Sequence, residues 1–312
     1  MTDHAAVLLE EAITALNIRQ DGIYLDATYG RGGHSRAIAG RLSPQGRLIA
    51  IDRDPEAVRH GRQHPPQGPR FDIAHSPFSR LRQVQQVLMP GGRADGILAD
   101  LGVSSPQLGD AERGFAFNRE GPLDMRMDPD SAPSAREWIA AAEQSELKWV
   151  IKTYGEEKFA GRIARAIVDR RADAPIDTTR DLAELIAQHV PAREPGRHPA
   201  TRTFQAIRMH INDELGQLQA FLPQAVECLG AAGRLVVISF HSLEDRIVKR
   251  FMRDEARGDP FPKDLPIAAS ELQPRLKIIG KPVRPSREEL QSNRRARSAI
   301  MRVAERTEAA HA

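Results

Sequence analysis

The sequence is short of the residues and segments on which several classes of protein depend. It contains one cysteine, Cys228, so no disulfide can form within the chain and no cysteine-rich zinc site can be built. No apolar run approaches the ~20 residues of a membrane-spanning helix, and the N-terminus has no basic segment followed by an apolar one. We therefore expect a cytoplasmic protein, in a reducing compartment and without a membrane segment.

The basic residues are mostly arginine. The formal net charge is only +3, yet the pI is about 9.2, and 38 of the 45 basic residues are arginine. Arginine suits bidentate phosphate contacts and stacking on bases, although codon use in a GC-rich genome would give the same composition. The places where the arginines cluster are therefore more informative than their number.

A glycine-rich stretch between a predicted strand and a predicted helix is the main functional signal. Residues 23–26 favour a strand that ends in Asp26, and three glycines follow within four positions, at Gly30, Gly32 and Gly33. Such a loop allows the backbone to approach a ligand closely. A second strand, at residues 48–52, ends in Asp52, which can accept hydrogen bonds from a ribose diol.

The glycine spacing does not fit the common nucleotide motifs. The third glycine of the dinucleotide fingerprint would fall at position 35, where the chain has Ser35, and no P-loop lysine follows. An adenosyl ligand without a pyrophosphate fits better, which favours S-adenosylmethionine, with Asp26 facing its cationic methionine end. A tight turn that binds nothing is the alternative.

Strands and helices alternate through the first hundred residues. Further strands are predicted at residues 71–75 and 94–102, so the pattern indicates a parallel sheet with helices on both faces. Ligands bind at the carboxyl ends of the strands in such sheets. Asp26, Asp52 and Asp100 each end a strand, and we expect the three carboxylates to share one crevice.

The alternation breaks after residue 104 and resumes about a hundred residues later. Helical patterns fill the interval, and then come one long amphipathic helix at 211–229, a strand at 234–240 and a late hairpin at 276–279 and 298–303. Seven strands with a late hairpin are typical of nucleoside-binding methyltransferases. We therefore predict a methyltransferase domain at residues 1–105 and 209–312, with an α-helical domain inserted at 106–208.

Laid out in this way, the chain resembles the RsmH (MraW) family of bacterial 16S rRNA cytosine-N4 methyltransferases nearly from end to end. The resemblance rests on long strings of residues, which are more specific than any glycine pattern. They lie at residues 29–35, 50–55, 100–108, 121–128, 198–206 and 238–246.

The resemblance implies a fold, a cofactor and a substrate. The fold is α/β, a Rossmann-like seven-stranded class I methyltransferase dependent on S-adenosylmethionine, whose helical insertion recognises the RNA substrate. The substrate is a decoding-centre cytidine of 16S rRNA in the small ribosomal subunit. The residues implied to bind the cofactor are Gly32, Gly33, His34, Asp52, Phe78, Asp100 and Gln107.

Methylation of cytosine N4 needs a group that accepts the amine proton, because the N4 lone pair is delocalised into the ring. Asp100 is our candidate for this catalytic role, or else it orients the donor, and His241 is an alternative acceptor. DNA amino-methyltransferases usually carry an Asn/Asp-Pro-Pro-Tyr string here, whereas this chain reads Asp-Leu-Gly-Val from Asp100. C5 methylation would need a thiolate, and Cys228 falls at a packing position of a helix. No histidine or cysteine spacing fits a metal site.

Two groups of basic residues could contact RNA, and a solvated charged face is the alternative for each. The first combines four arginines with Phe204, and the second follows the late loop. The candidates are Arg193, Arg197, Arg202, Arg208, Arg294, Arg295 and Arg297.

Two other functions are weighed against the methyltransferase. A nicotinamide-dependent dehydrogenase on a related fold would need the glycine that Ser35 replaces. An RNA-binding assembly factor with a vestigial site would not need the complete set of Asp26, Gly32, Asp52 and Asp100. We also consider a symmetric homodimer.

Overall fold

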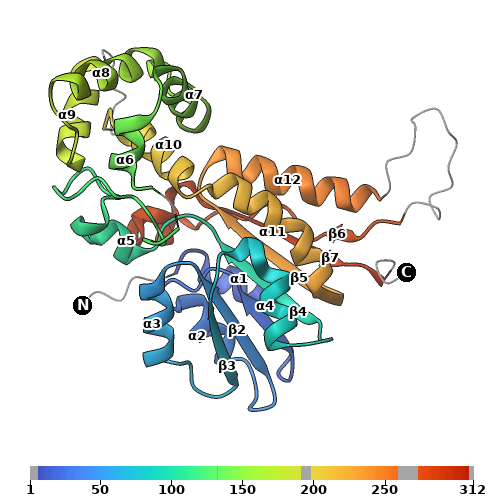
Figure 1. Cartoon of the computed structure of the whole chain (residues 1–312). Coiled ribbons are helices and arrows are strands. Elements are labelled where there is room, and N and C mark those ends of the chain that lie inside the picture. Colours follow the sequence, from blue (N-terminus) through green and yellow to red (C-terminus); the bar gives the residue numbers. More distant parts are fainter. Residues whose placement is uncertain (1–5, 132, 191–197, 259–272, 309–312) are drawn as a thin grey trace, which may run out of the picture. The chain divides into compact units, whose positions relative to one another are not determined.

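A computed structural model describes residues 6–131, 133–190, 198–258 and 273–308. The chain divides into two compact units (Figure 1). The first comprises Met1–Gly102 and Leu215–Ala312, and the second comprises Val103–Glu214. The boundaries predicted from the sequence lay at 105/106 and 208/209.

The first unit is built on one seven-stranded sheet. The strands stand in the order β3-β2-β1-β4-β5-β7-β6, with β1 to β5 parallel and β7 antiparallel to both its neighbours. The late hairpin thus places β7 between β5 and β6, unlike the 3-2-1-4-5-6 order of the dinucleotide-binding fold. The predicted Rossmann-like methyltransferase fold is confirmed. The strands are β1 (Ile23–Asp26), β2 (Arg47–Asp52), β3 (Arg70–His75), β4 (Ala94–Asp100), β5 (Leu229–Ser239), β6 (Leu276–Ile278) and β7 (Ile300–Arg306).

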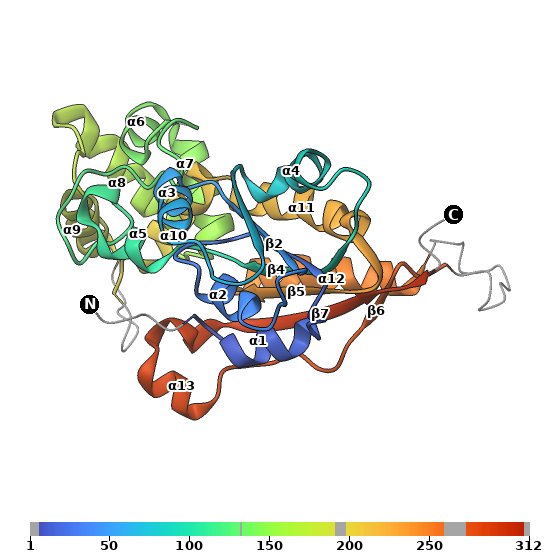
Figure 2. The ribbon, with the colours of Figure 1, turned by 90° about the horizontal axis from the view of Figure 1, so that it is seen from below.

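Helices cover both faces of this sheet because its strands carry apolar side chains on both faces. In β2, Leu48 and Ala50 face one layer, and Ile49 and Ile51 face the other. Figure 2 shows α1 on one side of the sheet and α4 and α11 on the other. One layer holds α1 (Leu9–Leu16), α2 (Gly33–Ala39) and α3 (Pro55–Gln63), and the other holds α4 (Leu81–Leu88), α11 (Glu214–Cys228) and α12 (Ser242–Arg257).

The predicted helix at 211–229 is wrong at its start. A preceding helix, α10 (Thr201–Ile211), ends there, and α11 begins separately at Glu214. Between them Asp213 has φ 47°, a left-handed conformation that a continuous helix does not allow. The sequence did not predict α10 as a helix, because its arginines were interpreted as part of an exposed basic segment.

The second unit is helical and has its own apolar core, to which Leu147, Ile163, Leu182 and Phe204 belong. Three of its helices start with a capping box, in which a Ser or Thr and the residue three positions later satisfy each other's backbone N–H. The helices are α5 (Ser105–Gly109), α6 (Ala135–Ala141), α7 (Gln144–Gly155), α8 (Ala160–Asp173), α9 (Thr179–His189) and α10.

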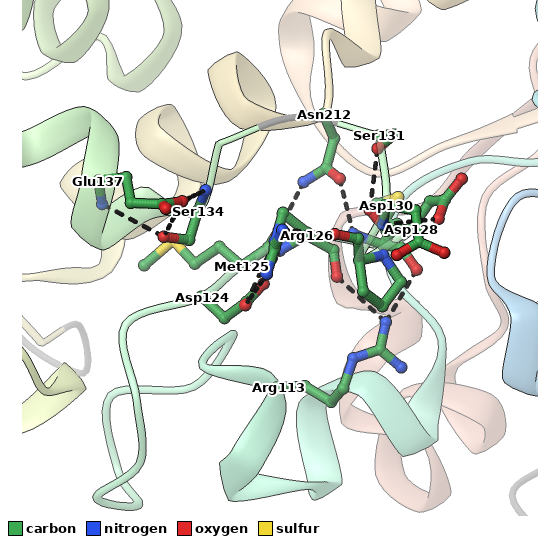
Figure 3. A network of polar contacts seen from close by, with 12 residues as sticks. Arg113, Asp124, Met125, Arg126, Asp128, Asp130, Ser131, Ser134, Glu137 and Asn212 are labelled. Carbon is green, nitrogen blue, oxygen red and sulfur yellow. Dashed lines mark hydrogen bonds and ion pairs between the residues drawn. The ribbon is translucent and has the colours of Figure 1, made fainter.

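The loop before α6 is held by a polar network within this second unit (Figure 3). The Asn212 side chain donates to the Met125 carbonyl at 2.7 Å and accepts from the Met127 N–H at 2.8 Å. Arg113 donates to the carbonyls of Arg126 and Met127. Met125 is fully buried with φ 62°, a strained conformation for a residue with a Cβ. These bonds hold the loop in one shape despite that strain.

In the described part of the chain, no helix combines the length and apolar character that crossing a membrane requires.

Candidate cofactor site

The glycine loop that follows β1 is fastened to the sheet by Asp26. The Asp26 carboxylate accepts a hydrogen bond from Ser35 Oγ at 2.6 Å and another from the Thr28 N–H at 3.1 Å. Its side chain is 1% exposed, and burial raises its pKa. The carboxylate is thus enclosed by the loop that it holds in place, and the idea that it faces a bound donor stays a prediction.

Asp52, at the end of β2, holds the other side of the same loop. One carboxylate oxygen accepts the Gly30 N–H at 2.7 Å, and the other accepts the Asp54 N–H at 2.8 Å. Burial raises the pKa of Asp52 to about 6, although both hydrogen bonds oppose this rise. The side chain is only partly buried. Each carboxylate oxygen can accept a further hydrogen bond, so the group is fixed in place and still able to bind a diol.

Gly32 and Gly33 fit the loop only because they lack side chains. Gly32 has φ +73°, and a Cβ there would lie 2.7 Å from the Tyr29 ring. A Cβ on Gly33 would lie 2.9 Å from the Cβ of Ala6. Tyr29 itself is buried and its N–H donates to the Ile51 carbonyl of β2 at 3.0 Å. The loop is therefore a close-packed turn whose course is fixed by contacts within it.

His34 opens α2 and links the loop to β4. Its Nε2 lies 3.1 Å from the Val7 carbonyl, and its Nδ1 lies 3.7 Å from Asp100 Oδ2. A carbonyl only accepts hydrogen bonds, so Nε2 carries the proton in this contact. Burial lowers the pKa of His34 to about 4, so the ring is neutral at pH 7 and turns the Nδ1 lone pair toward Asp100.

Asp100 is the most perturbed carboxyl group of the site. Its N–H donates to Thr28 Oγ1 at 2.7 Å, which joins β4 to the loop after β1. Burial, together with the neighbouring carboxylates of Asp26 and Glu244, raises the pKa of Asp100 well above its ordinary value, and Arg295 opposes this rise. Its Oδ1 is buried and has no hydrogen-bond partner among the described residues.

These positions test whether the site suits S-adenosylmethionine. Since β2, β1 and β4 are adjacent and parallel, Asp52, Asp26 and Asp100 lie at one edge of the sheet, as the sequence predicted. A buried carboxylate oxygen without a partner is costly unless a ligand satisfies it. The unpaired Oδ1 of Asp100 and the negative charge around it suit a cationic donor with polar hydrogens, so the residues present fit this cofactor.

Phe78 and Gln107 are the remaining predicted cofactor residues. Phe78 begins a short 3₁₀ turn, Phe78–Arg80, after β3, and its side chain is half-buried. The Phe78 and Phe221 rings are perpendicular, with their centroids 5.2 Å apart. Gln107 lies in the second unit, where it is buried and its side-chain carbonyl accepts the Ser104 N–H at 2.9 Å in the capping box of α5. That local role accounts for Gln107 within its own unit, and its contact with the cofactor stays a prediction.

His241, the alternative catalytic group, is the N-cap of α12, with Nδ1 accepting the Glu244 N–H at 3.3 Å and Nε2 3.1 Å from Glu244 Oε1. Its catalytic role stays a prediction. Cys228 is fully buried, and burial raises the pKa of its thiol to about 12. A thiol with a raised pKa is a poor nucleophile, and its burial agrees with the predicted packing position of Cys228.

The predicted RNA-contacting arginines differ in what surrounds them. Arg208 is mostly buried and makes two hydrogen bonds to Glu214, at 2.7 and 2.9 Å, so it supports the second unit from within. Arg295 is half-buried near Asp100 and not on an open surface. Arg202 is half-buried in α10, Arg297 is exposed, and Arg294 lies in the 3₁₀ turn Arg294–Ser298. Arg193 and Arg197 lie outside the described residues.

Sequence reasoning missed three supporting residues of the site. The Thr28 hydroxyl accepts the Asp100 N–H, and the Ser35 hydroxyl donates to the Asp26 carboxylate. Glu244 accepts the Phe240 N–H at 2.9 Å, and its charge acts on Asp100. A short polar residue two positions after Asp26 was a usable signal for Thr28, because such pairs form local turns. Glu244 gave no signal, since a helix residue distant in the chain meets Asp100 only in the folded protein.

The sheet order, the glycine loop and the carboxylates at the strand ends define a class I methyltransferase. Comparison with known proteins then gives the family. Residues 1–307 match the family described as MraW methylase, and the chain belongs to this family. It is 56% identical over 304 residues to the "Ribosomal RNA small subunit methyltransferase H" of Chromohalobacter salexigens, covering 97% of this chain and 91% of that protein.

Solved structures show a distant likeness. A putative rRNA-methylase from Clostridium thermocellum has a TM-score of 0.44 at 9% identity, covering 96% of this chain and 98% of that one. NSun6 from Pyrococcus horikoshii has a TM-score of 0.43 at 13% identity, covering 97% of this chain and 52% of that one. With the family established, the dehydrogenase hypothesis is wrong.

Proposed function

We propose that this chain transfers a methyl group from S-adenosylmethionine to N4 of a decoding-centre cytidine in 16S rRNA of the small ribosomal subunit. The methylase family and the relative in C. salexigens support the reaction class and the substrate. The observation that carries the proposal is the unpaired, buried Oδ1 of Asp100 beside a loop held by Asp26 and Asp52.

In this proposal each residue of the site has a defined task. Asp52, fixed by the N–H groups of Gly30 and Asp54, accepts the ribose hydroxyls. Gly32 and Gly33 bring the backbone close to the methionine end of the donor, with His34 at the start of α2, and Phe78 offers the face of its ring to adenine. The sulfonium of S-adenosylmethionine supplies an activated methyl group when it is bound.

Asp100 has the catalytic task, because it is the carboxylate of the site with an unused oxygen. Its raised pKa makes it a better proton acceptor than an ordinary carboxylate once it is ionised. A cationic donor nearby favours the ionised form. Asp100 would then orient the cytosine amine and accept its proton after methyl transfer, while the bond from its backbone N–H to Thr28 Oγ1 holds this end of β4 in place.

The helical second unit is proposed to recognise the RNA. Its exposed or half-buried basic residues include Arg202, whose replacement by alanine should weaken RNA binding and spare donor binding. A symmetric homodimer and a cytoplasmic location stay predictions.

The test is transfer of labelled methyl from S-adenosylmethionine to small-subunit rRNA that lacks the mark, offered as naked RNA, as assembly intermediates and as the 30S particle. We expect incorporation into one of these. No incorporation into any of them would favour an RNA-binding assembly factor with a vestigial site.

A further inference from the structure

Helix α12 carries a row of basic side chains along one exposed face. They recur every three or four residues, so they lie on the same side of the helix. At 1.5 Å per residue the row extends for roughly 12 Å. All four side chains are exposed: Lys249, Arg250, Arg253 and Arg257. We call this row the α12 stripe.

The acidic residues of α12 leave the stripe largely uncompensated. Asp245 binds Arg302 of β7 through two hydrogen bonds of 2.7 and 3.0 Å, and Glu255 binds Arg275 at 2.5 Å. Glu244 is buried. Asp254 is 3.1 Å from Arg253, but both side chains are about half exposed, and such pairs add little. The charge of the stripe is therefore available to an anionic partner.

A groove of about 200 Å³ opens beside the middle of the stripe. Lys249, Met252 and Arg253 of α12 form one wall, and the end of β6 with the turn that follows it forms the other. Ile278, at the lip, is 49% exposed, which is unusual for a large apolar residue without a partner. Lys281 adds a further exposed cation on the far wall. The groove is apolar inside and basic at its rim.

The helix that carries the stripe begins close to the proposed catalytic edge of the sheet. Helix α12 starts directly after β5, and β5 pairs with β4 so that Ile238 lies opposite Asp100. Glu244, in the first turn of α12, is among the carboxylates that perturb the pKa of Asp100. Figure 1 shows α12 running from this edge along the sheet toward β6. A chain bound on the stripe therefore leads toward Asp100.

We propose that the α12 stripe and its groove hold a single-stranded segment of the substrate RNA next to the target nucleotide. Phosphates lie along the stripe, and one base enters the groove against Met252 and Ile278. The proposal rests on the proposed function, since it takes the substrate to be RNA. A regular row of cations suits the repeating charge of a phosphate backbone. The groove is smaller than the ~300–1,000 Å³ of pockets that enclose drug-sized ligands, and a single base needs less room.

The experiment measures binding of unmodified 16S rRNA, transcribed in vitro, at several salt concentrations. The stripe variant is Lys249→Ala with Arg250→Ala, and neither residue has an ion pair with another described residue. Each lost phosphate contact lowers the salt slope by about 0.7 for single-stranded RNA. Two lost contacts therefore predict a slope smaller by about 1.4, and a Kd higher by about 25-fold at 0.1 M salt if affinities converge at 1 M.

The matched control is Arg41→Ala with Arg70→Ala, which removes the same charge at the opposite, amino-terminal edge of the sheet. We expect it to bind nearly as wild type. The groove variant, Ile278→Ser, should weaken RNA binding about fivefold and leave the salt slope unchanged. The reason is that the exposed half of the Ile278 side chain is no longer there for the bound base to cover. All three substituted positions are exposed, and thermal unfolding verifies that each variant is folded.

A stripe variant with the affinity and salt slope of the wild type would overturn the proposal and would point to an acidic protein partner instead. If the stripe variant bound RNA more weakly but Ile278→Ser bound it as tightly as the wild type, the groove contact would be overturned. Methyl transfer separates this proposal from the function itself: the stripe variant should raise KM for rRNA and retain kcat. If the wild type transfers no methyl group to any rRNA form, the proposed function fails whatever the binding curves show.

Discussion

Replacing Asp52 by asparagine should weaken cofactor binding strongly and leave the ligand-free protein at least as stable as the wild type. The carboxylate of Asp52 is ionised at pH 7.5 despite a pKa raised to about 6 from an ordinary value of 3.8. Each unit of pKa corresponds to about 1.4 kcal/mol. The folded protein therefore loses about 3 kcal/mol of stability as the pH rises through this range, because the unfolded chain ionises first.

Asparagine removes that cost and keeps the shape of the side chain. It also has only one acceptor oxygen, so it can accept from Gly30 or from Asp54 but not from both. Losing a hydrogen bond to a charged group costs about 1.5–3 kcal/mol. The two effects partly cancel, and we expect the ligand-free Asp52→Asn variant to be as stable as wild type or up to about 1.5 kcal/mol more stable.

Donor binding should fall sharply in the same variant. A carboxylate that accepts two ribose hydroxyls loses about 3 kcal/mol or more of binding energy when its charge is removed, which is a factor of about 100 in Kd. Calorimetric titration with S-adenosylmethionine measures the affinity, and thermal unfolding with and without donor measures stability. Asp52→Ala should abolish binding altogether.

Asp95→Asn is the control, because Asp95 also accepts a backbone N–H, that of Ile23 at 2.9 Å, but at the amino-terminal edge of the sheet. It should leave donor binding unchanged. Normal donor affinity in Asp52→Asn and Asp52→Ala would refute our placement of the site.

Four further predictions follow from the geometry. In wild type, donor affinity should fall about tenfold between pH 7 and pH 5 in calorimetry, because protonation of Asp52 near pH 6 removes the acceptor; an affinity independent of pH would contradict this. Gly32→Ala should reduce donor binding at least tenfold and lower the Tm, since its Cβ would overlap Tyr29. Asn212→Ala should cost about 2–4 kcal/mol in denaturant unfolding, as two buried hydrogen bonds are lost, and unchanged stability would argue against the network. Cys228→Ala should retain methyl transfer, because the thiol is buried with a raised pKa. A folded Cys228→Ala variant that transfers no methyl group would instead support a thiolate mechanism.

The sheet and its ligand edge could be predicted from sequence because the signals are local. A strand that ends in Asp26 or Asp52, followed by glycines or by the Asp54-Pro55 helix start, marks the carboxyl edge without any knowledge of the fold. Position at the end of a parallel strand then brings the acids together.

The internal contacts of the site were not predictable in the same way. The burial that encloses Asp26, and the approach of Glu244 and Arg295 to Asp100, depend on segments far apart in the chain. Arg208 shows the same limit, because a basic run suggests a surface until Glu214 is seen to pair with it. The α12 stripe escaped notice because its charges are spread through a helix and do not form a run in the sequence.

Nucleoside mass analysis of 16S rRNA tests the central claim most directly. Unmodified rRNA, as naked RNA and within small-subunit particles, is incubated with S-adenosylmethionine and either the wild-type protein or Asp100→Asn. We predict N4-methylcytidine at one decoding-centre position with wild type and little or none with the variant. A methyl group at C5 of cytosine, or no new methylated nucleoside in any form of the RNA, would contradict the account.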